Sequence, residues 1–316
     1  MLFKRWITAV VLIPVLLLIV LKGSPLAFTF LVLFLSLAGM AEYFKIISAL
    51  STDLFAKKLP NTGLSDANHC NESVSLKEQC IQNNISLQKT VPLKDKCVRA
   101  PVPLSLQVIA YIMTATIIAA SHSGSCSMVL LSLACNVIVM SLFAVLKFRS
   151  DSSILDFVAA EIQGVFYIPL FLSFLVLLRN GENGSHWVLW LWIIIGVSDT
   201  GAYFVGSNFG RRALAKHVSP KKTVEGALGG LGIAAFFGLI YAFVFIDQIN
   251  FSMAIVFSIA TAASGQLGDL FESALKRAAG IKDSGNILPG HGGILDRIDG
   301  LIFAAPVAYL FRVFIL

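Results

Sequence analysis

The sequence predicts an all-α, polytopic integral membrane protein with about nine transmembrane helices and a cytoplasmic N-terminus. Hydrophobic residues make up 57% of the chain and charged residues only 13%, and the mean hydropathy is +0.82. A soluble globular protein would contain more charge and less apolar sequence. The apolar segments are continuous and do not alternate with polar residues, which argues against a transmembrane β-barrel.

Apolar runs that are candidates for membrane-spanning helices occur along most of the chain. They lie at residues 6–22, 25–44, 104–121, 127–146, 164–178, 187–206, 226–246, 251–269 and 300–316. Residues 1–21 resemble a signal peptide because Lys4 and Arg5 precede an apolar core, but no small-residue cleavage site follows. We therefore expect this segment to remain as the first helix.

The distribution of Lys and Arg predicts which loops face the cytoplasm. Lys4 and Arg5 place the N-terminus inside, and alternation of the helices then assigns further segments to the same side. These segments are 45–103, 147–163, 207–225 and 270–299. They carry nearly all the basic residues, so the net charge of +6 indicates orientation and does not imply a nucleic-acid partner.

The predicted spans divide the chain into four regions. They are an N-terminal hairpin at 1–50, a polar cytoplasmic insertion at 51–103, middle transmembrane helices at 104–186 and a C-terminal transmembrane region at 187–316, which holds the candidate site. The insertion is either a disordered loop or a small cytoplasmic cap, and its composition favours disorder. In the middle region, Asp151, Asp156 and Glu161 are expected on a solvated interfacial helix, and the alternative is that these acids approach the site.

The stretch at 268–300 concentrates charges of both signs in this apolar chain, and it reads GDLFESALKRAAGIKDSGNILPGHGGILDRIDG. Asp269, Glu272 and Lys276 are spaced so that they share one face of a helix. The central SGNILPGHGG contains a proline and several glycines, which predict a tight turn. A helix, a turn and a second helix are therefore expected here.

Such a turn brings Asp269 towards Asp296 and Asp299, which share a face of the second helix. Carboxylates of this kind suit Mg²⁺, which takes one or two of them and leaves its other positions to water and phosphate oxygens. The neighbouring basic residues would then contact the phosphates. Alternatively, this is a cytoplasmic loop whose opposite charges only pair with one another.

A second informative stretch lies at 197–226. Asp199 falls inside the sixth expected span, where an ionisable group is costly to bury and is usually functional, although a structural Asp near Thr200 is the alternative. The stretch SPKKT at 219–223 leads into the next helix, whose N-terminus favours an anion beside Lys222 and Thr223. The alternative is a basic loop that fixes orientation or contacts lipid headgroups.

Three motifs in this half of the chain resemble those of the phosphatidate cytidylyltransferases, also called CDP-diacylglycerol synthases. The run SALKRAAGIKDSGNILPGHGGILDRID, from Ser273 to Asp299, is similar to the family signature. D-T-x-A-Y at 199–203 and S-P-K-K-T-x-E-G at 219–226 also resemble that family, in the expected order. The N-terminal spans agree only in their hydrophobic layout, and the insertion at 51–103 departs from the compact bacterial pattern.

This resemblance implies an activity, a fold and a set of partners. The activity is transfer of a cytidylyl group from CTP to phosphatidate, which gives CDP-diacylglycerol and pyrophosphate for phospholipid synthesis. The implied fold is an all-helical membrane fold. The protein is expected to form a homodimer in the bacterial inner membrane, with the active site facing the cytoplasm. No nucleic-acid partner is expected. Mg²⁺ is the expected cofactor, and a second cation such as K⁺ is compatible with the family.

The motifs also assign roles to residues. The expected metal ligands are Asp269, Asp296 and Asp299. The expected catalytic residues are Lys276, Arg277, Lys282, Asp283, His291 and Arg297, and the expected substrate-binding residues are Asp199, Ser219, Lys221, Lys222 and Thr223. His291 either positions a phosphate or stabilises the turn.

Three other functions share parts of this pattern. A CTP-dependent lipid kinase or a cytidylyltransferase for another lipid phosphate would differ in the acceptor pocket, which the sequence does not reveal. A transporter for an anionic lipid would need charge near the bilayer midplane and inverted repeats. Here the charge gathers on one side of the membrane and no repeat is visible, so transport is disfavoured.

Overall fold

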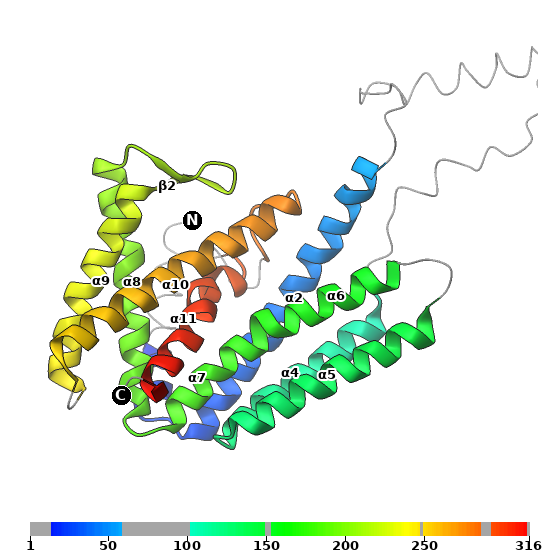
Figure 1. Ribbon diagram of the computed structural model, residues 1–316, viewed down its shortest axis with the longest axis horizontal. Coiled ribbons are helices and arrows are strands. Elements are labelled where there is room, and N and C mark those ends of the chain that lie inside the picture. The colour runs from blue at the N-terminus through cyan, green and yellow to red at the C-terminus, as the bar shows by residue number, and fades with distance from the viewer. Residues whose placement is uncertain (1–13, 59–101, 149–152, 247–248, 286–291, 315–316) are drawn as a thin grey trace, which may run out of the picture.

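The computed structural model describes residues 14–58, 102–148, 153–246, 249–285 and 292–314. Helices make up nearly all of this structure (Figure 1). In the first half, residues 14–21 are helical and precede α2 (Pro25–Lys58), α4 (Leu104–His122) and α5 (Cys126–Lys147). Next come α6 (Ser153–Val165), the π-helical turn η2 (Phe166–Leu170) and α7 (Phe171–Asn180), which together form one continuous helix around Pro169.

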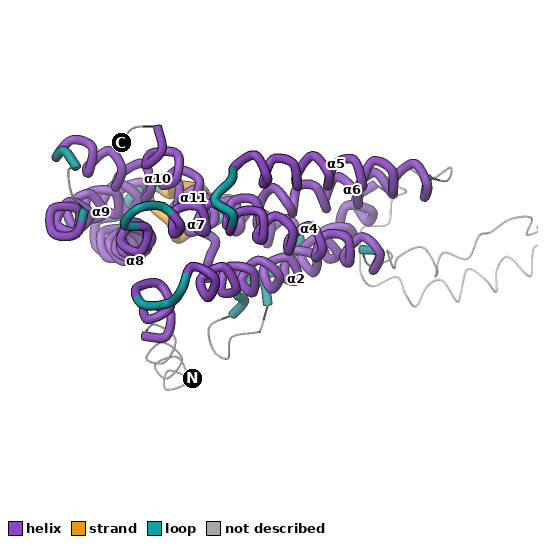
Figure 2. The backbone as a smooth tube through the Cα atoms, turned by 90° about the horizontal axis from the view of Figure 1, so that it is seen from below, coloured by secondary structure: helices purple, strands orange, loops and turns teal. Residues whose placement is uncertain are grey.

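The second half contains four long helices and one small hairpin. Its elements are α8 (Gly184–Phe209), β1 (Ala213–Ala215), β2 (Ser219–Thr223), α9 (Val224–Phe245), α10 (Phe251–Ala278) and α11 (Leu295–Phe314). The antiparallel pair β1–β2 is the one sheet within the described ranges. Figures 1 and 2 show α8, α9 and α10 at one side of the molecule, α2, α4, α5 and α6 at the other, and α7 and α11 between them.

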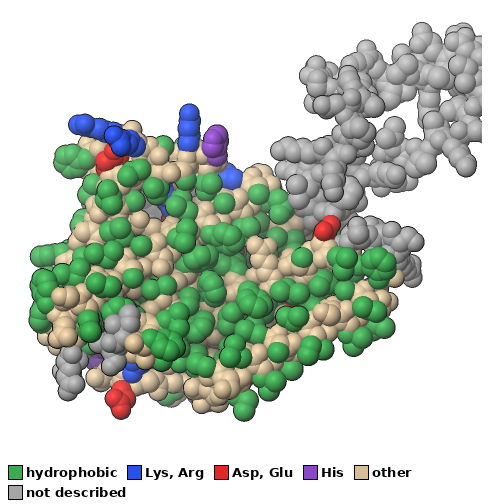
Figure 3. Space-filling view, viewed as in Figure 1, with side chains coloured by type: hydrophobic (Ala, Val, Ile, Leu, Met, Phe, Trp, Pro, Cys, Tyr) green, Lys and Arg blue, Asp and Glu red, His purple; other side chains and the backbone are tan. Residues whose placement is uncertain are grey.

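Seven helical stretches in the described part of the chain are long and apolar enough to cross a membrane. They are Pro25–Leu50, Leu104–His122, Cys126–Lys147, Ile154–Asn180, Gly184–Phe209, Val224–Phe245 and Phe251–Ala278. The chain is therefore an all-α polytopic membrane protein, as predicted. Figure 3 shows the corresponding surface, in which apolar side chains cover most of this face and charged ones lie mainly along its upper and lower edges.

The predicted count of nine spans is not settled by these helices. The first expected span, 6–22, lies partly outside the described residues, which begin at residue 14, and the last one corresponds to α11, which is not among the seven. The first two turns of α11 carry Asp296, Arg297 and Asp299. The cytoplasmic N-terminus also remains a prediction, as does disorder in the insertion, because residues 59–101 lie outside the described ranges.

The structure corrects the expectation for Glu161. Its helix runs on through η2 into α7 as one stretch long and apolar enough to cross a membrane, and the Glu161 side chain is fully buried, whereas Asp156 on the same helix is exposed. The Glu161 carboxylate interacts with the buried Asn136 side chain of α5 and makes no hydrogen bond to α10 or α11 among the described residues. The apolar residues on both sides of Glu161 extend the helical stretch, so one acidic residue did not mark its end.

Glycines let α8 and α9 approach each other closely. A Cβ atom added at Gly230 would lie 2.6 Å from the carbonyl oxygen of Ser198, whereas one added at Gly232 would meet nothing within 4 Å. Gln266 of α10 ties the same helices together, because its side-chain amide donates to the Ser198 hydroxyl (3.1 Å) and the Ala227 carbonyl (3.2 Å). The start of α9 and the middle of α8 are thereby tied to α10.

Candidate active site

A lysine of the hairpin meets an aspartate of α10 at the end of the bundle where α11 begins. The Lys222 ammonium donates to Asp269 Oδ2, and the Ser273 hydroxyl donates to Asp269 Oδ1 (3.4 Å). The Lys222 and Asp269 side chains are 31% and 33% exposed, so both are reachable from solution. The structure therefore brings the SPKKT stretch and Asp269 together.

A second lysine joins α10 to α11. Lys276 Nζ donates to Glu272 Oε2 at 2.6 Å and to Asp296 Oδ1 at 2.5 Å. The Glu272 side chain is only 1% exposed, and its other oxygen makes no hydrogen bond within the described ranges. Lys276 thus bridges two carboxylates in a site from which water is largely excluded, where an ion pair is stronger than at the surface.

Asp296 is fully engaged in this arrangement. Its Oδ2 accepts from the backbone N–H of Ser284 (3.1 Å) and of Gly293 (2.9 Å), while Oδ1 binds Lys276. Burial acts to raise the pKa of Asp296, but the hydrogen bonds from Lys276 and Gly293 and the positive charge outweigh it and lower the pKa to about 2. Asp296 is therefore ionised, and it anchors the loop that precedes α11.

Asp299 lies one turn further along α11, in the electrostatic field of two other aspartates. Its Oδ1 accepts from the Gly300 N–H at 2.7 Å. Burial, followed by the negative charge of Asp269, raises the pKa of Asp299 above its ordinary value, and Asp199 of α8 acts in the same direction. Gly268 allows this closeness, since a Cβ atom at that position would collide with the carbonyl oxygen of Asp299.

Aromatic rings lie next to the acidic residues. Tyr167 of η2 packs against Phe271 of α10 (5.1 Å between ring centroids) and Phe303 of α11 (6.0 Å). Tyr167 is buried, and its hydroxyl lies within electrostatic range of Glu272, Asp299 and Asp269. These rings hold α10 and α11 in place and lower the local dielectric, which strengthens interactions among the charges.

The hairpin corrects one detail of the predicted anion site. The stretch at 219–223 is the strand β2 and not a loop, and the Thr223 hydroxyl caps α9 by accepting from the Gly226 N–H at 3.1 Å. One N–H group expected to face an anion is therefore already satisfied. Lys222 points to Asp269, Lys221 is exposed, and Ser219 is half-buried at the other end of the strand.

The remaining predicted residues lie around the cluster. Arg277 is exposed and lies next to the hairpin, with Nε 3.4 Å from the Val218 carbonyl oxygen. Lys282, Asp283 and Arg297 are also exposed. His291 lies outside the described residues, so its predicted role is not tested.

The donor chemistry of the cluster suits Mg²⁺, although no group of three or more His, Cys, Asp or Glu side chains in the described residues is arranged to hold a metal ion. Mg²⁺ commonly takes only one or two carboxylates and fills its other positions with water and phosphate. Asp269 and Asp299 meet that requirement, because Asp299 lies within the electrostatic field of Asp269 and Asp269 is partly exposed. Asp296 is committed to Lys276 and the backbone.

Two glutamates belong to this region that the sequence did not place in the site. Glu272 was recognised only as a residue on the helix face of Asp269, and it turns out to bind Lys276. Glu42 of α2 is fully buried and bonds to Ser284 and to the start of α11. An acidic residue within a predicted span was the signal available for Glu42, since such residues are rare and usually have a specific partner.

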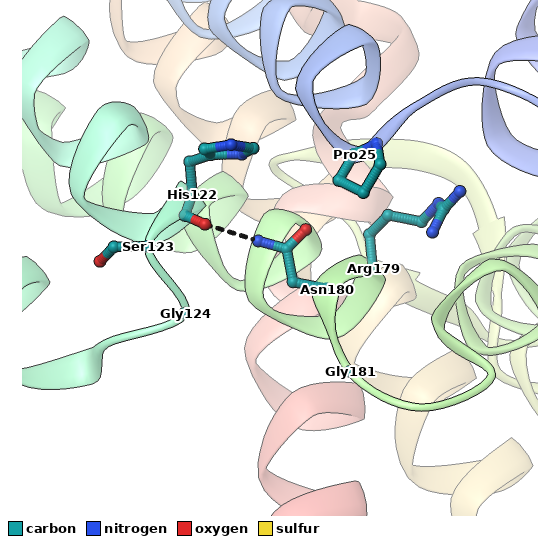
Figure 4. Close-up of a pocket in the computed structure, with 7 residues that line it drawn as sticks. All are labelled: Pro25, His122, Ser123, Gly124, Arg179, Asn180 and Gly181. Atoms are coloured by element: carbon teal, nitrogen blue, oxygen red, sulfur yellow. Dashed lines mark hydrogen bonds between the residues drawn. The ribbon is translucent and has the colours of Figure 1, made fainter.

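A cavity of about 470 Å³ lies at the other end of the bundle (Figure 4). Its lining includes Pro25, His122, Arg179 and Asn180, and the Asn180 amide donates to the His122 carbonyl at 3.0 Å. Pro25 and Glu42 lie on one helix and are about 25 Å apart along its axis at 1.5 Å per residue. This cavity is therefore separate from the acidic cluster, and it lies where α2, α4 and α7 meet.

Comparison with known proteins finds a matching family profile and similar curated proteins. The profile described as "Cytidylyltransferase family" matches residues 87–315. This range contains α4 to α11, the hairpin and every residue of the cluster except Glu42.

Three curated proteins illustrate the similarity, and each is named phosphatidate cytidylyltransferase. One from Bacillus subtilis is 43% identical over 144 residues, which cover 45% of this chain and 54% of that protein. One from Thermotoga maritima is 38% identical over 181 residues (53% and 64%), and one from Haemophilus influenzae is 44% identical over 142 residues (42% and 48%). The chain thus matches about half the length of these relatives.

Proposed function

Because the chain belongs to the cytidylyltransferase family, we propose that it transfers a cytidylyl group from CTP to phosphatidate and releases pyrophosphate, with CDP-diacylglycerol as the lipid product. The observation that carries this proposal is the meeting of Lys222 with Asp269 and of Lys276 with Asp296. These pairs join β2, α10 and α11 at one end of the bundle. The three segments that form them are also those that carry the family-like motifs.

The chemistry requires no nucleophilic side chain. A phosphate oxygen of phosphatidate attacks the α-phosphorus of CTP, a new phosphoanhydride bond forms, and the bond between the α- and β-phosphates breaks. The electron pair of the broken bond leaves with pyrophosphate. The attacking oxygen is already anionic near neutral pH, so the main obstacle is repulsion between two anionic substrates, and positively charged groups must offset it.

Lys222 and Lys276 are the residues we assign to this task. Lys222 is partly exposed and bound to a single carboxylate, so it is able to exchange Asp269 for a phosphate oxygen. Lys276 lies deeper, between Glu272 and Asp296, and keeps a positive charge fixed beside the substrates. Arg277 and Arg297 are exposed near the same end and are assigned to the outer phosphates.

Asp269 and Asp299 are the residues we assign to Mg²⁺, with Asp199 beside them and Asp296 acting mainly through Lys276 and the loop. The bound ion would supply positive charge to the triphosphate and to the leaving pyrophosphate. The oxygen-rich set also has the chemistry to accept a second cation such as K⁺. The chain's own contribution is to hold these carboxylates next to the packed aromatic rings of Tyr167 and Phe271.

The proposal extends to the location and assembly of the protein. CTP is dissolved in the cytosol and phosphatidate lies in the bilayer, so the site belongs at the cytoplasmic surface of the membrane. We expect the bacterial inner membrane, with the basic loops inside. A homodimer is expected from the family resemblance.

The direct test uses the purified protein in detergent with labelled CTP, phosphatidate and Mg²⁺. We expect a labelled lipid product and one equivalent of pyrophosphate. Lysophosphatidate and an inositol lipid phosphate, offered in place of phosphatidate, test the acceptor. CTP labelled at the α-phosphate reports cytidylyl transfer, whereas a labelled nucleotide-free lipid phosphate formed from CTP labelled at the γ-phosphate would indicate a kinase instead. No labelled lipid with either label and any acceptor would refute the proposal.

A further inference from the structure

We propose that Glu42 of α2 is a positioning residue that fixes the start of α11 and thereby the places of Asp296 and Asp299. The inference rests on the proposed function for its effect on turnover, but it stands on contacts of its own. Glu42 lies in the N-terminal hairpin, outside residues 87–315 where the family profile matches. Its partners follow it in the chain by more than two hundred residues.

The Glu42 carboxylate accepts hydrogen bonds from both sides of the loop before α11. Oε2 accepts from the Ser284 hydroxyl at 2.9 Å and from the Leu295 N–H at 2.8 Å. Oε1 accepts from the Ile294 N–H at 3.1 Å. The side chain is 0% exposed, so water does not compete for these bonds. A carboxylate at a helix N-terminus is further stabilised by the helix dipole.

Asp296 also hydrogen-bonds to the loop that Glu42 binds. Its Oδ2 accepts from the backbone N–H groups of Ser284 and Gly293, so both ends of the loop are bound by both carboxylates. Ser284 gives its hydroxyl to Glu42 and its backbone N–H to Asp296. A shift of the Glu42 carboxylate would therefore be passed to Asp296 through a residue they share.

The backbone around Glu42 is shaped to admit its carboxylate. A Cβ atom added at Gly285 would collide with Oε1, and one added at Gly293 would press against Oε2. Larger residues at either position would force the carboxylate away from its donors. Glycine is thus required here for close approach.

The contact matters for catalysis because reacting groups must be held in place to within a fraction of an ångström. Misplacement by about 1 Å can reduce turnover roughly 100-fold, even when it originates away from the chemistry. Asp296 lies in the first turn of α11 and Asp299 in the next. Both carboxylates would move if the start of the helix loosened.

The test compares Glu42→Gln with Glu161→Gln in the full-length protein. Both glutamates are fully buried in the bundle, but Glu161 has no hydrogen-bonded partner at α11 among the described residues. Glu42→Asp shortens the side chain but keeps its charge, and Ser284→Ala removes one of the three hydrogen bonds. Kinetics, thermal stability in detergent and amide hydrogen exchange of the peptide that contains Ile294 and Leu295 are measured for each variant.

For Glu42→Gln we expect kcat to fall about 100-fold with KM for CTP changed less than about threefold, because orientation is lost and binding is retained. In Ser284→Ala, kcat should fall less. In Glu42→Asp, kcat should be higher than in Glu42→Gln but lower than in the unaltered protein. Exchange at Ile294 and Leu295 should become about tenfold faster in Glu42→Gln, since hydrogen bonds to a charged acceptor are lost. Glu161→Gln should leave kcat and this exchange unchanged.

Two results would overturn the inference. One is unchanged kcat in folded Glu42→Gln protein, and the other is equal loss of kcat in Glu42→Gln and Glu161→Gln that follows their loss of stability. If the unaltered protein makes no CDP-lipid, the proposed function fails by itself. The exchange measurement then still tests whether Glu42 fixes the start of α11, and unchanged exchange would refute it. If Glu42→Gln does not fold, Ser284→Ala and Glu42→Asp carry the same comparison.

Discussion

The two ends of the helix bundle use their charged side chains in different ways. At the end opposite the acidic cluster, guanidinium groups bind backbone carbonyls: Arg179 donates to Gly23 (3.1 Å), and Arg312 donates to Leu178 (2.9 Å) and to Glu182. At the start of α11, two lysines bind several carboxylates, and aspartates lie within range of one another.

The difference separates structural charge from functional charge. Carbonyl groups at helix C-termini need donors, so a guanidinium there completes the helix ends and joins neighbouring segments. Carboxylates that repel one another cost stability in a buried site, and they are expected where a ligand or reaction uses them. Changes at the acidic end should therefore affect activity most, and changes at the opposite end should affect stability alone.

Asp269→Asn should give the largest effect. We expect CDP-lipid formation to fall by about three orders of magnitude, because a carboxylate next to the reacting phosphates is lost. The melting temperature in detergent should change little, since an ion pair that is about one-third exposed contributes at most about 1 kcal/mol. Exposed Glu182 at the opposite end provides the control, and Glu182→Gln should retain full activity. Full activity in Asp269→Asn would remove this residue from the site.

Lys276→Met should weaken both the fold and the activity. Removing the ammonium leaves Glu272 and Asp296 without their common partner, which typically costs about 3–5 kcal/mol for a buried pair. The double variant Lys276→Met with Glu272→Gln should recover part of the stability but none of the activity. Thermal unfolding and product formation on the same samples separate the two effects, and recovery of activity in the double variant would contradict the assignment of Lys276.

Arg312→Met should lower stability by about 2 kcal/mol, because two carbonyl groups lose their donor. The guanidinium also stacks over Trp187, 5.6 Å from the ring centroid, and the methionine retains part of that apolar contact. The rate per folded molecule should equal that of the unaltered protein at a temperature where both are folded. A loss of kcat in the folded variant would show that the two ends are coupled.

Asn180→Leu should give the smallest effect, a change in stability below about 1 kcal/mol. The variant loses the hydrogen bond to the His122 carbonyl (3.0 Å), but it also removes a buried amide oxygen that has no hydrogen-bond partner in the described part of the chain. The two contributions oppose each other. A thermal shift assay compares the melting temperatures of Asn180→Leu and Arg312→Met. A larger loss of stability in Asn180→Leu would contradict the order of effects proposed for this end of the bundle.

Much of the candidate site was predictable because its residues lie close in sequence. Glu272 and Lys276 are one helical turn apart in α10 and do form an ion pair, and α11 follows α10 after a loop, as the turn residues indicated. The sequence assigned Lys222 and Asp269 to the same candidate site but did not predict that they pair, since the two residues belong to different elements. That β2 is a strand was missed, because its residues read as a loop before a helix.

The sequence by itself determined that this chain is a helical membrane protein and that its charge is concentrated near the last two helices, because hydropathy and local spacing act within a few turns. It also determined the family, through motifs that are continuous in the chain. Only the tertiary structure decided that Glu42 reaches Leu295, 253 residues later, and that Glu161 is buried. Both depend on which helices pack side by side, and that choice is made by the whole bundle rather than by any local pattern.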